Sequence, residues 1–198
     1  MSSDFSSTLA SQNRSFDLVK WELKPAAVLL LELNRPQKLN ALNKGLLENL
    51  SKLLEVAAAC DDVNCVVLTG GRKAFSVGAD VEDMAQRGLA AYLDDDRLRY
   101  WKSIETFPKP IVAAVSGYVL GGGCELMMLC DIAIAAETAQ FGQPEITIAS
   151  IPGDGGTQRL PRLVGKSAAM QMILTGQHLG ARHMLDIGLI SEVAREED

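Results

Sequence analysis

Residues 110–158 read PIVAAVSGYVLGGGCELMMLCDIAIAAETAQFGQPEITIASIPGDGGTQ, and this stretch decides the fold. Ile111 to Val115 and Asp131 to Ala135 each predict a short apolar strand. Between them, the glycines at 121–123 precede a predicted helix that opens at Cys124-Glu125. Glycine lets a backbone N–H approach a ligand with no Cβ in the way, and a helix N-terminus favours an anion. The stretch therefore predicts an anion-stabilising site with carboxylates nearby.

Outward from this stretch, strands and helices continue to alternate. The sequence predicts further strands at 16–22, 26–33 and 65–68, and helices at 43–60, 94–107, 155–163, 167–175 and 181–187. Asn43 is the expected N-cap of its helix, and a leucine stripe follows it. Such alternation is typical of an α/β fold with helices outside and strands within.

Composition narrows the function classes. A chain of 198 residues with 47% hydrophobic residues suffices for one domain with a buried core. The net charge of −6 and the lack of a Lys/Arg cluster argue against a nucleic-acid partner. No apolar run approaches the ~20 residues of a membrane helix. The four cysteines show no zinc-ligand spacing, which predicts reduced thiols, no metal and a cytoplasmic protein.

Five sequence blocks resemble one known family. They are NRPQKLNAL at 34–42, AFSVGADVEDM at 74–84, GGGCELMMLCD at 121–131, FGQPEITIASIPGDGGTQRL at 141–160 and LTGQHLGARHMLDIGLISEV at 174–193. In this order and at these spacings they are similar to the crotonase superfamily, the enoyl-CoA hydratases and isomerases. The resemblance covers roughly residues 16–193.

The resemblance implies a crotonase-type spiral of repeated ββα units with outer helices. Residues 16–198 are expected to form this core domain, and the polar, serine-rich residues 1–15 a flexible tail. The family normally has further C-terminal helices, so the resemblance also suggests a truncated C-terminal helical region. A homotrimer or dimer of trimers is the implied assembly.

The resemblance also implies the site residues. Glu125 and Glu145 occupy the positions of the family's two catalytic glutamates, with Glu145 as proton donor to C2 and Glu125 as the group that orients and deprotonates water. The N–H groups of Ala79 and Gly122 match the oxyanion hole. The implied contacts to substrate or CoA are Lys38, Leu39, Ala74, Ser76, Gly78, Ala79, Asp80, Val81, Tyr118, Gly121, Gly122, Pro144 and Gly153.

The activity that this implies is hydration of a 2-trans-enoyl-CoA to a 3-hydroxyacyl-CoA in acyl-CoA degradation. The acyl-CoA thioester is the substrate, and no separate cofactor is expected. Two alternatives stay open: double-bond isomerisation or another crotonase reaction, and a non-catalytic acyl-CoA-binding or assembly subunit.

Asp154 departs from the family pattern, because short-chain hydratases commonly carry alanine there. An extra carboxylate beside the acyl pocket is expected to alter substrate choice or the pKa values of the acid–base pair.

The motifs of other enzyme classes are incomplete in this sequence. Gly165-Lys166-Ser167 lacks the preceding glycine of a P-loop, and neither G-x-G-x-x-G after a strand nor G-x-S-x-G occurs. His178 and His183 are interpreted as ordinary surface or capping histidines.

Overall fold

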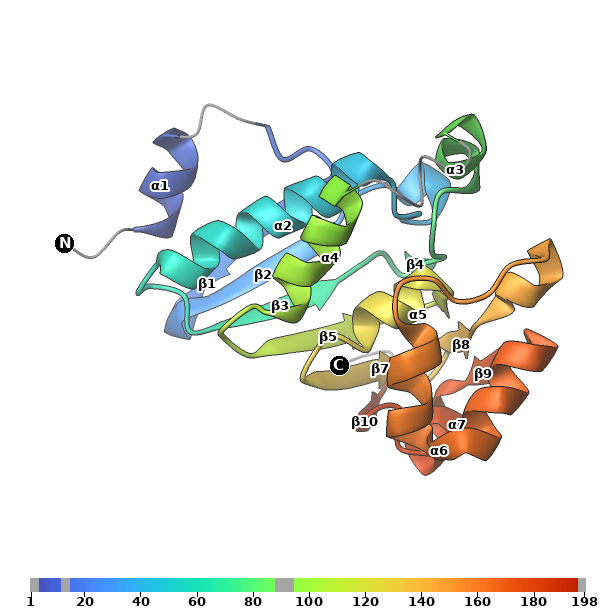
Figure 1. Cartoon of the computed structure of the whole chain (residues 1–198). Coiled ribbons are helices and arrows are strands. Elements are labelled where there is room, and N and C mark those ends of the chain that lie inside the picture. The colour runs from blue at the N-terminus through green and yellow to red at the C-terminus, as the bar shows by residue number, and fades with distance from the viewer. Residues whose placement is uncertain (1–3, 12–14, 88–94, 196–198) are drawn as a thin grey trace.

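A mostly parallel sheet runs through the centre of the computed structural model, which describes residues 4–11, 15–87 and 95–195 (Figure 1). Within these residues the sheet has six strands in the order β1-β2-β3-β5-β7-β10. β1 and β2 are antiparallel and every other neighbouring pair is parallel. The bounds are β1 Val19–Lys24, β2 Val28–Leu33, β3 Cys65–Thr69, β5 Ile111–Val115, β7 Ile132–Ala136 and β10 Glu192–Ala194. The strands predicted at 26–33, 65–68, 111–115 and 131–135 are confirmed to within two residues, whereas β1 begins three residues later than predicted.

A smaller sheet of very short strands lies beside the large one. Its order in the described part of the chain is β4-β6-β8-β9, parallel except for the β8–β9 pair. The bounds are β4 Ala74–Ser76, β6 Tyr118–Leu120, β8 Gln140–Gly142 and β9 Leu179–Gly180. β4, β6 and β8 each follow a strand of the large sheet and precede a helical segment. This repeat is the spiral of ββα units that the resemblance implied.

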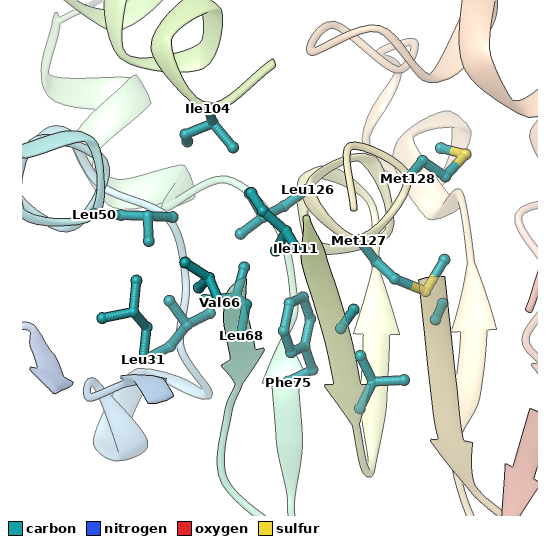
Figure 2. Close-up of a cluster of buried hydrophobic side chains, with 14 of the residues drawn as sticks. Leu31, Leu50, Val66, Leu68, Phe75, Ile104, Ile111, Leu126, Met127 and Met128 are labelled. Atoms are coloured by element: carbon teal, nitrogen blue, oxygen red, sulfur yellow. The ribbon is translucent and has the colours of Figure 1, made fainter. Parts of the chain in front are cut away.

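Two long helices cover one face of the large sheet, α2 Lys44–Ala59 and α4 Asp95–Glu105 (Figure 1). The N-cap prediction is confirmed, because the Asn43 side chain accepts a hydrogen bond from Leu46 N at 2.9 Å. Leu50 of α2 and Ile104 of α4 are almost completely buried against strand residues such as Val66 (Figure 2). Burial of this leucine-rich stripe fixes both helices on the sheet.

The other helical segments lie in the connections between strands. Their bounds are η1 Pro25–Ala27, η2 Pro36–Lys38, α3 Val81–Arg87, α5 Gly122–Met127, η4 Pro144–Ile148, α6 Gly156–Thr175 and α7 Ala181–Asp186. α6 is broken at Gly165, where φ is 77° and ψ is 163°, so the two helices predicted on either side of it are present. Asp94, the predicted start of the 94–107 helix, lies outside the described residues. None of the described helices combines the length and apolarity needed to cross a bilayer.

Residues 5–11 correct one prediction. They lie within the expected flexible tail but form helix α1, Phe5–Ser11. Phe5 is fully buried and Leu9 nearly so, and the Phe5 ring packs edge-on against Trp21 at 5.4 Å between centroids. Asp62 Oδ2 accepts a hydrogen bond from Phe5 N at 3.0 Å, which holds the helix start. Two apolar side chains in a polar, serine-rich segment carry little periodic signal, so the sequence pattern missed this helix.

Replacing Phe5 by alanine tests this packing. Removing a fully buried phenylalanine typically lowers the free energy of unfolding by about 3–5 kcal/mol, whereas the same change in a flexible tail has almost no effect. We expect the larger loss in urea-induced unfolding. Ser6→Ala, on the exposed side of α1, is the matched control and should change stability by no more than about 0.5 kcal/mol. Equal stability of the two variants would contradict the packed helix.

Candidate active site

A cavity of about 210 Å³ lies where the chain leaves the strands of the small sheet. Its wall comes from the loop after β4, the start of α5, the segment η4 and the loop before α6, with α4 on another side. The described lining residues are Leu42, Lys44, Val77, Gly78, Ala79, Asp83, Met84, Arg97, Leu98, Gly121, Gly122, Glu125, Pro144, Glu145, Thr147, Ile148, Ser150, Ile151, Gly153 and Asp154. The site thus joins segments that lie between residues 42 and 154 of the chain.

Two backbone amides meet at this cavity. Gly122 is the first residue of α5, where a helix leaves its N–H groups without an intrahelical partner. A Cβ placed on Gly122 would lie 3.5 Å from Ala79 N, so the two segments are in contact. Neither the Ala79 nor the Gly122 N–H has an acceptor among the described residues. The predicted oxyanion donors are therefore neighbours that border the same space.

Gly78 makes this approach possible. Its φ of +94° is unfavourable for other residues, and a Cβ there would stand 2.9 Å from Gly122 N. Leu42 N donates to Gly78 O at 2.7 Å, and Asp80 N donates to Leu42 O at 3.3 Å. These bonds fix the loop on both sides of Ala79 and leave the Ala79 N–H for the cavity.

Glu125 is 1% exposed and lies in the first turn of α5. Its Oε1 accepts hydrogen bonds from Asp154 N at 2.9 Å and from Gly156 N at 2.6 Å. Burial, and then the charge of Asp154, raise the pKa of Glu125 to about 7, while the two amide donors act in the opposite direction. The carboxyl is therefore held in place and titrates near neutral pH.

Glu145 approaches the cavity from η4. Its Oε1 would stand 3.0 Å from a Cβ on Gly121, so it faces the start of α5. Gln143, fully buried, directs its amide at this carboxylate, and with Nε2 toward Glu145 it donates to Oε1 at 3.0 Å and to Oε2 at 3.2 Å. Burial, with a further contribution from Asp154, raises the pKa of Glu145. Sequence reasoning did not identify Gln143, since a glutamine before Pro-Glu carries no chemical signal by itself.

Asp154 brings a third carboxylate to the cavity, and Arg97 of α4 forms a salt bridge with its Oδ2. The two side chains are only 14% and 20% exposed. Burial raises the pKa of Asp154, and the Arg97 charge opposes this effect. The Arg159 guanidinium also donates to the Asp154 carbonyl oxygen. The sequence identified Asp154 as unusual but did not predict Arg97, because nothing in the sequence links residues 57 positions apart.

Eight of the residues predicted for the site line the cavity. They are Gly78, Ala79, Gly121, Gly122, Glu125, Pro144, Glu145 and Gly153. The other seven do not line it: Lys38, Leu39, Ala74, Ser76, Asp80, Val81 and Tyr118.

Several residues outside the cavity support the loop that carries Ala79. Ser76 Oγ donates to Asn40 O at 2.8 Å and accepts from Gly78 N at 3.2 Å. Asp80 pairs with Arg35 at 2.9 Å. Leu39 has a left-handed backbone, and its carbonyl accepts from Val77 N at 3.2 Å. Leu39, Ser76 and Asp80, which were predicted to bind substrate or CoA, therefore support the Ala79 loop from outside the cavity.

The remaining four lie in different surroundings. Lys38 forms an exposed salt bridge with Glu82 at 2.8 Å. Ala74 is buried in β4, and Val81 is 57% exposed at the start of α3. Tyr118 begins β6 and packs edge-on against His178. Their contact with CoA stays a prediction. In the described ranges, no three His, Cys, Asp or Glu side chains gather as they would around a metal ion.

Sequence reasoning also missed the apolar part of the wall. Leu42, Val77, Met84, Leu98, Ile148 and Ile151 line the cavity. Leu98, Ile148 and Ile151 are more than half exposed, which is unusual for large apolar side chains grouped around one opening. The sequence does show apolar residues in the segments that form η4 and α4. Hydrophobic periodicity, however, assigns such residues to a buried core rather than to the wall of a cavity.

The layered spiral and the pair of neighbouring amides, one of them at the start of α5, define a crotonase-fold protein. An enoyl-CoA hydratase from Bacillus anthracis has the same fold, with a TM-score of 0.85 and 37% identity over 91% of this chain and 71% of that one. The model of the enoyl-CoA hydratase/isomerase family matches residues 24–198, and the chain belongs to this family.

Curated relatives include proteins named as hydratases. The 2,3-dehydroadipyl-CoA hydratase of Escherichia coli is 50% identical over 166 residues, covering 84% of this chain and 65% of that protein. A mitochondrial enoyl-CoA hydratase of Pongo abelii is 47% identical over 174 residues, covering 88% of this chain and 60% of that protein. The chain thus spans somewhat less than two thirds of the length of these relatives.

The raised pKa of Glu125 predicts a pH-dependent stability. Between its ordinary value of 4.5 and about 7, the folded state holds a proton that the unfolded chain has lost. The contribution of Glu125 to stability is therefore greatest below pH 4.5 and falls as pH rises to about 7, by about 3 kcal/mol at most. Glu125→Gln removes this term. We expect the stability difference between variant and wild type to grow in favour of the variant from pH 5 to 7.5. A difference that is constant with pH would contradict the buried, protonated carboxyl.

Proposed function

We propose that this protein hydrates 2-trans-enoyl-CoA thioesters, adding water across the C2–C3 double bond to give 3-hydroxyacyl-CoA. One observation carries the proposal: two carboxyl groups with raised pKa values, Glu125 and Glu145, border the same cavity as two unpaired backbone amides. The hydratase names of the relatives from Escherichia coli and Pongo abelii support it.

The amides of Ala79 and Gly122 are the proposed oxyanion hole. When water adds to C3, negative charge develops on the thioester oxygen, and two fixed N–H donors stabilise it more than they stabilise the neutral carbonyl. The Gly122 N–H also lies at the positive end of α5, which favours the same charge. Because these amides have no acceptor in the described chain, no internal bond must break before the thioester oxygen binds.

The two glutamates divide the proton transfers. Glu125, ionised, takes a proton from the attacking water while the water oxygen bonds to C3. Glu145, protonated, gives its proton to C2, so that one water is added in total. Solvent exchange then restores both groups. Two donors to Oε1 orient Glu125 and leave Oε2 for the water, and burial maintains the proton on Glu145.

Two carboxyls favour hydration over double-bond isomerisation. Isomerisation moves a single proton between carbons, for which one carboxyl suffices, whereas hydration needs a base for water and an acid for carbon. Glu125 is buried and accepts hydrogen bonds from two amides. Burying a carboxyl group costs folding free energy, which favours a direct catalytic role over a supporting one. The homotrimer or dimer of trimers and the cytoplasmic location stay predictions.

Replacing either glutamate by glutamine tests the paired acid and base. We expect Glu145→Gln and Glu125→Gln each to lower kcat for hydration by about 100-fold or more, because the amide neither donates nor accepts the proton. The measurement is loss of the enoyl-thioester absorbance of crotonyl-CoA. KM should change little.

Glu137→Gln is the control, since this exposed residue pairs with Arg182 and does not line the cavity in the described part of the chain. A 3-enoyl-CoA is assayed in parallel. If Glu125→Gln were fully active in hydration, or if only isomerisation were seen in the wild type, the two-acid mechanism would be abandoned.

Two substitutions of Gly122 separate its N–H from its size. Proline fits the first position of a helix and deletes this N–H, while alanine keeps it and adds only the Cβ. That Cβ meets its nearest neighbour, Asp154 Oδ2, at 3.4 Å, which is ordinary contact distance. We expect Gly122→Pro to show a kcat about 10²–10³ below that of Gly122→Ala, as for loss of one oxyanion donor. Equal kcat in the two folded variants would place the thioester oxygen elsewhere.

A further inference from the structure

The charged groups of the cavity wall are unevenly divided. Among the described lining residues, the cations are Lys44 and Arg97, whereas the carboxyls are Asp83, Glu125, Glu145 and Asp154. Lys44 Nζ lies 3.0 Å from an oxygen of Asp96, and Arg97 binds Asp154. Both cations therefore already have an anionic partner, and the wall offers no excess positive charge.

Arg97 is the cation best placed to recognise an anionic group on an acyl chain. Its guanidinium is mostly buried, stacks over the Trp101 ring at 5.8 Å, and lies in the wall beside the apolar Leu98. A planar guanidinium in such surroundings binds a carboxylate strongly. In this chain the carboxylate it binds belongs to the protein itself.

The main chain of Asp154 is held in place beside Arg97. Its N–H donates to Glu125 Oε1 at 2.9 Å, and its carbonyl oxygen accepts from Arg159. Backbone bonds on both sides hold the residue, and α6 starts two positions later. A substrate carboxylate would have to displace a fixed, partly buried partner and would then leave a second carboxylate without compensation.

We propose that Asp154 is a specificity-determining residue that occupies Arg97 and so restricts the cavity to acyl chains without an anionic end group. The inference rests on the proposed hydratase function and names its substrate class: uncharged, apolar 2-enoyl thioesters, to the exclusion of thioesters whose acyl chain ends in a second carboxylate. The apolar side chains of Met84, Leu98 and Ile148 in the same wall suit an uncharged chain.

Two substrates of equal length test this. Trans-2-hexenoyl-CoA and 2,3-didehydroadipyl-CoA both have six acyl carbons and differ in the terminal carboxylate. The readout is the ratio of their kcat/KM values, in which effects of Asp154 on the pKa values of Glu125 and Glu145 largely cancel. We expect the wild type to favour the hexenoyl thioester by about 30-fold or more.

Four variants give the proposal its sharpest test. Asp154→Ala frees Arg97 and should move the ratio toward the dicarboxylyl thioester by about 30-fold or more. Asp154→Asn keeps the shape without the charge and should move it less, in the same direction. Adding Arg97→Gln to Asp154→Ala should cancel the gain. Glu137→Gln removes one carboxylate from the surface and should leave the ratio unchanged.

Binding of the saturated thioesters hexanoyl-CoA and adipyl-CoA, measured by calorimetry on the same proteins, separates this inference from the proposed function. A matching shift in the Kd ratio without any hydration would uphold the specificity role and overturn the hydratase. If the wild type hydrates enoyl thioesters but the kcat/KM ratio changes by less than about threefold in Asp154→Ala, the hydratase function is upheld and the specificity role is overturned. A wild type that already prefers the dicarboxylyl thioester would also overturn the inference.

Discussion

The site depends on a backbone approach that only glycine permits. A Cβ on Gly123 would lie 2.3 Å from Ser76 O, and one on Gly78 would lie 2.9 Å from Gly122 N. No side chain, however small, fits at these distances. The loop after β4 and the start of α5 therefore touch through bare backbone, and this contact brings the Ala79 and Gly122 amides to one side of one cavity. Larger residues would separate the two spiral turns and the two donors together.

The carboxyls of the cavity weaken the fold that carries them. Burial of Glu125 and Glu145 raises both pKa values, so ionising either group at neutral pH costs folding free energy. The two amide donors to Glu125 offset part of that cost, and the Arg97–Asp154 salt bridge offsets part of the charge nearby. Functional sites commonly contain such destabilising arrangements, and favourable packing elsewhere in the protein must offset the loss of folding free energy. Here the buried core includes the contact of α2 and α4 with the large sheet, whose apolar side chains pack away from the cavity carboxyls (Figure 2).

Sequence patterns predicted the parts of this protein that are periodic or capped. The α2 helix followed from Asn43 and its leucine stripe, and the break in α6 lies in the gap between the helices predicted at 155–163 and 167–175. The small sheet was not predicted, because strands of two or three residues are too short to show alternation. The family resemblance named both glutamates and both amides, but the partners Gln143 and Arg97 come from long-range packing. No local rule places Arg97 against a residue 57 positions away. The α1 helix was missed for a similar reason, since Phe5 is buried by Trp21 rather than by its own segment.

The order of the short strands explains why these groups meet. β4, β6 and β8 are parallel neighbours, so the segments that leave their carboxyl ends emerge side by side. Ala79 comes three residues after β4, Gly122 two after β6, and Glu145 three after β8. Gly121 N donates to Gly142 O at 2.9 Å, which ties the second and third of these segments together. The spacing of these strands thus sets how far apart the Ala79 amide, the Gly122 amide at the start of α5 and the Glu145 carboxyl lie. Asp154 lies in the same connection as Glu145, since β9 follows only after α6. The third turn of the spiral therefore brings both the acid and the Arg97-paired carboxylate to the cavity.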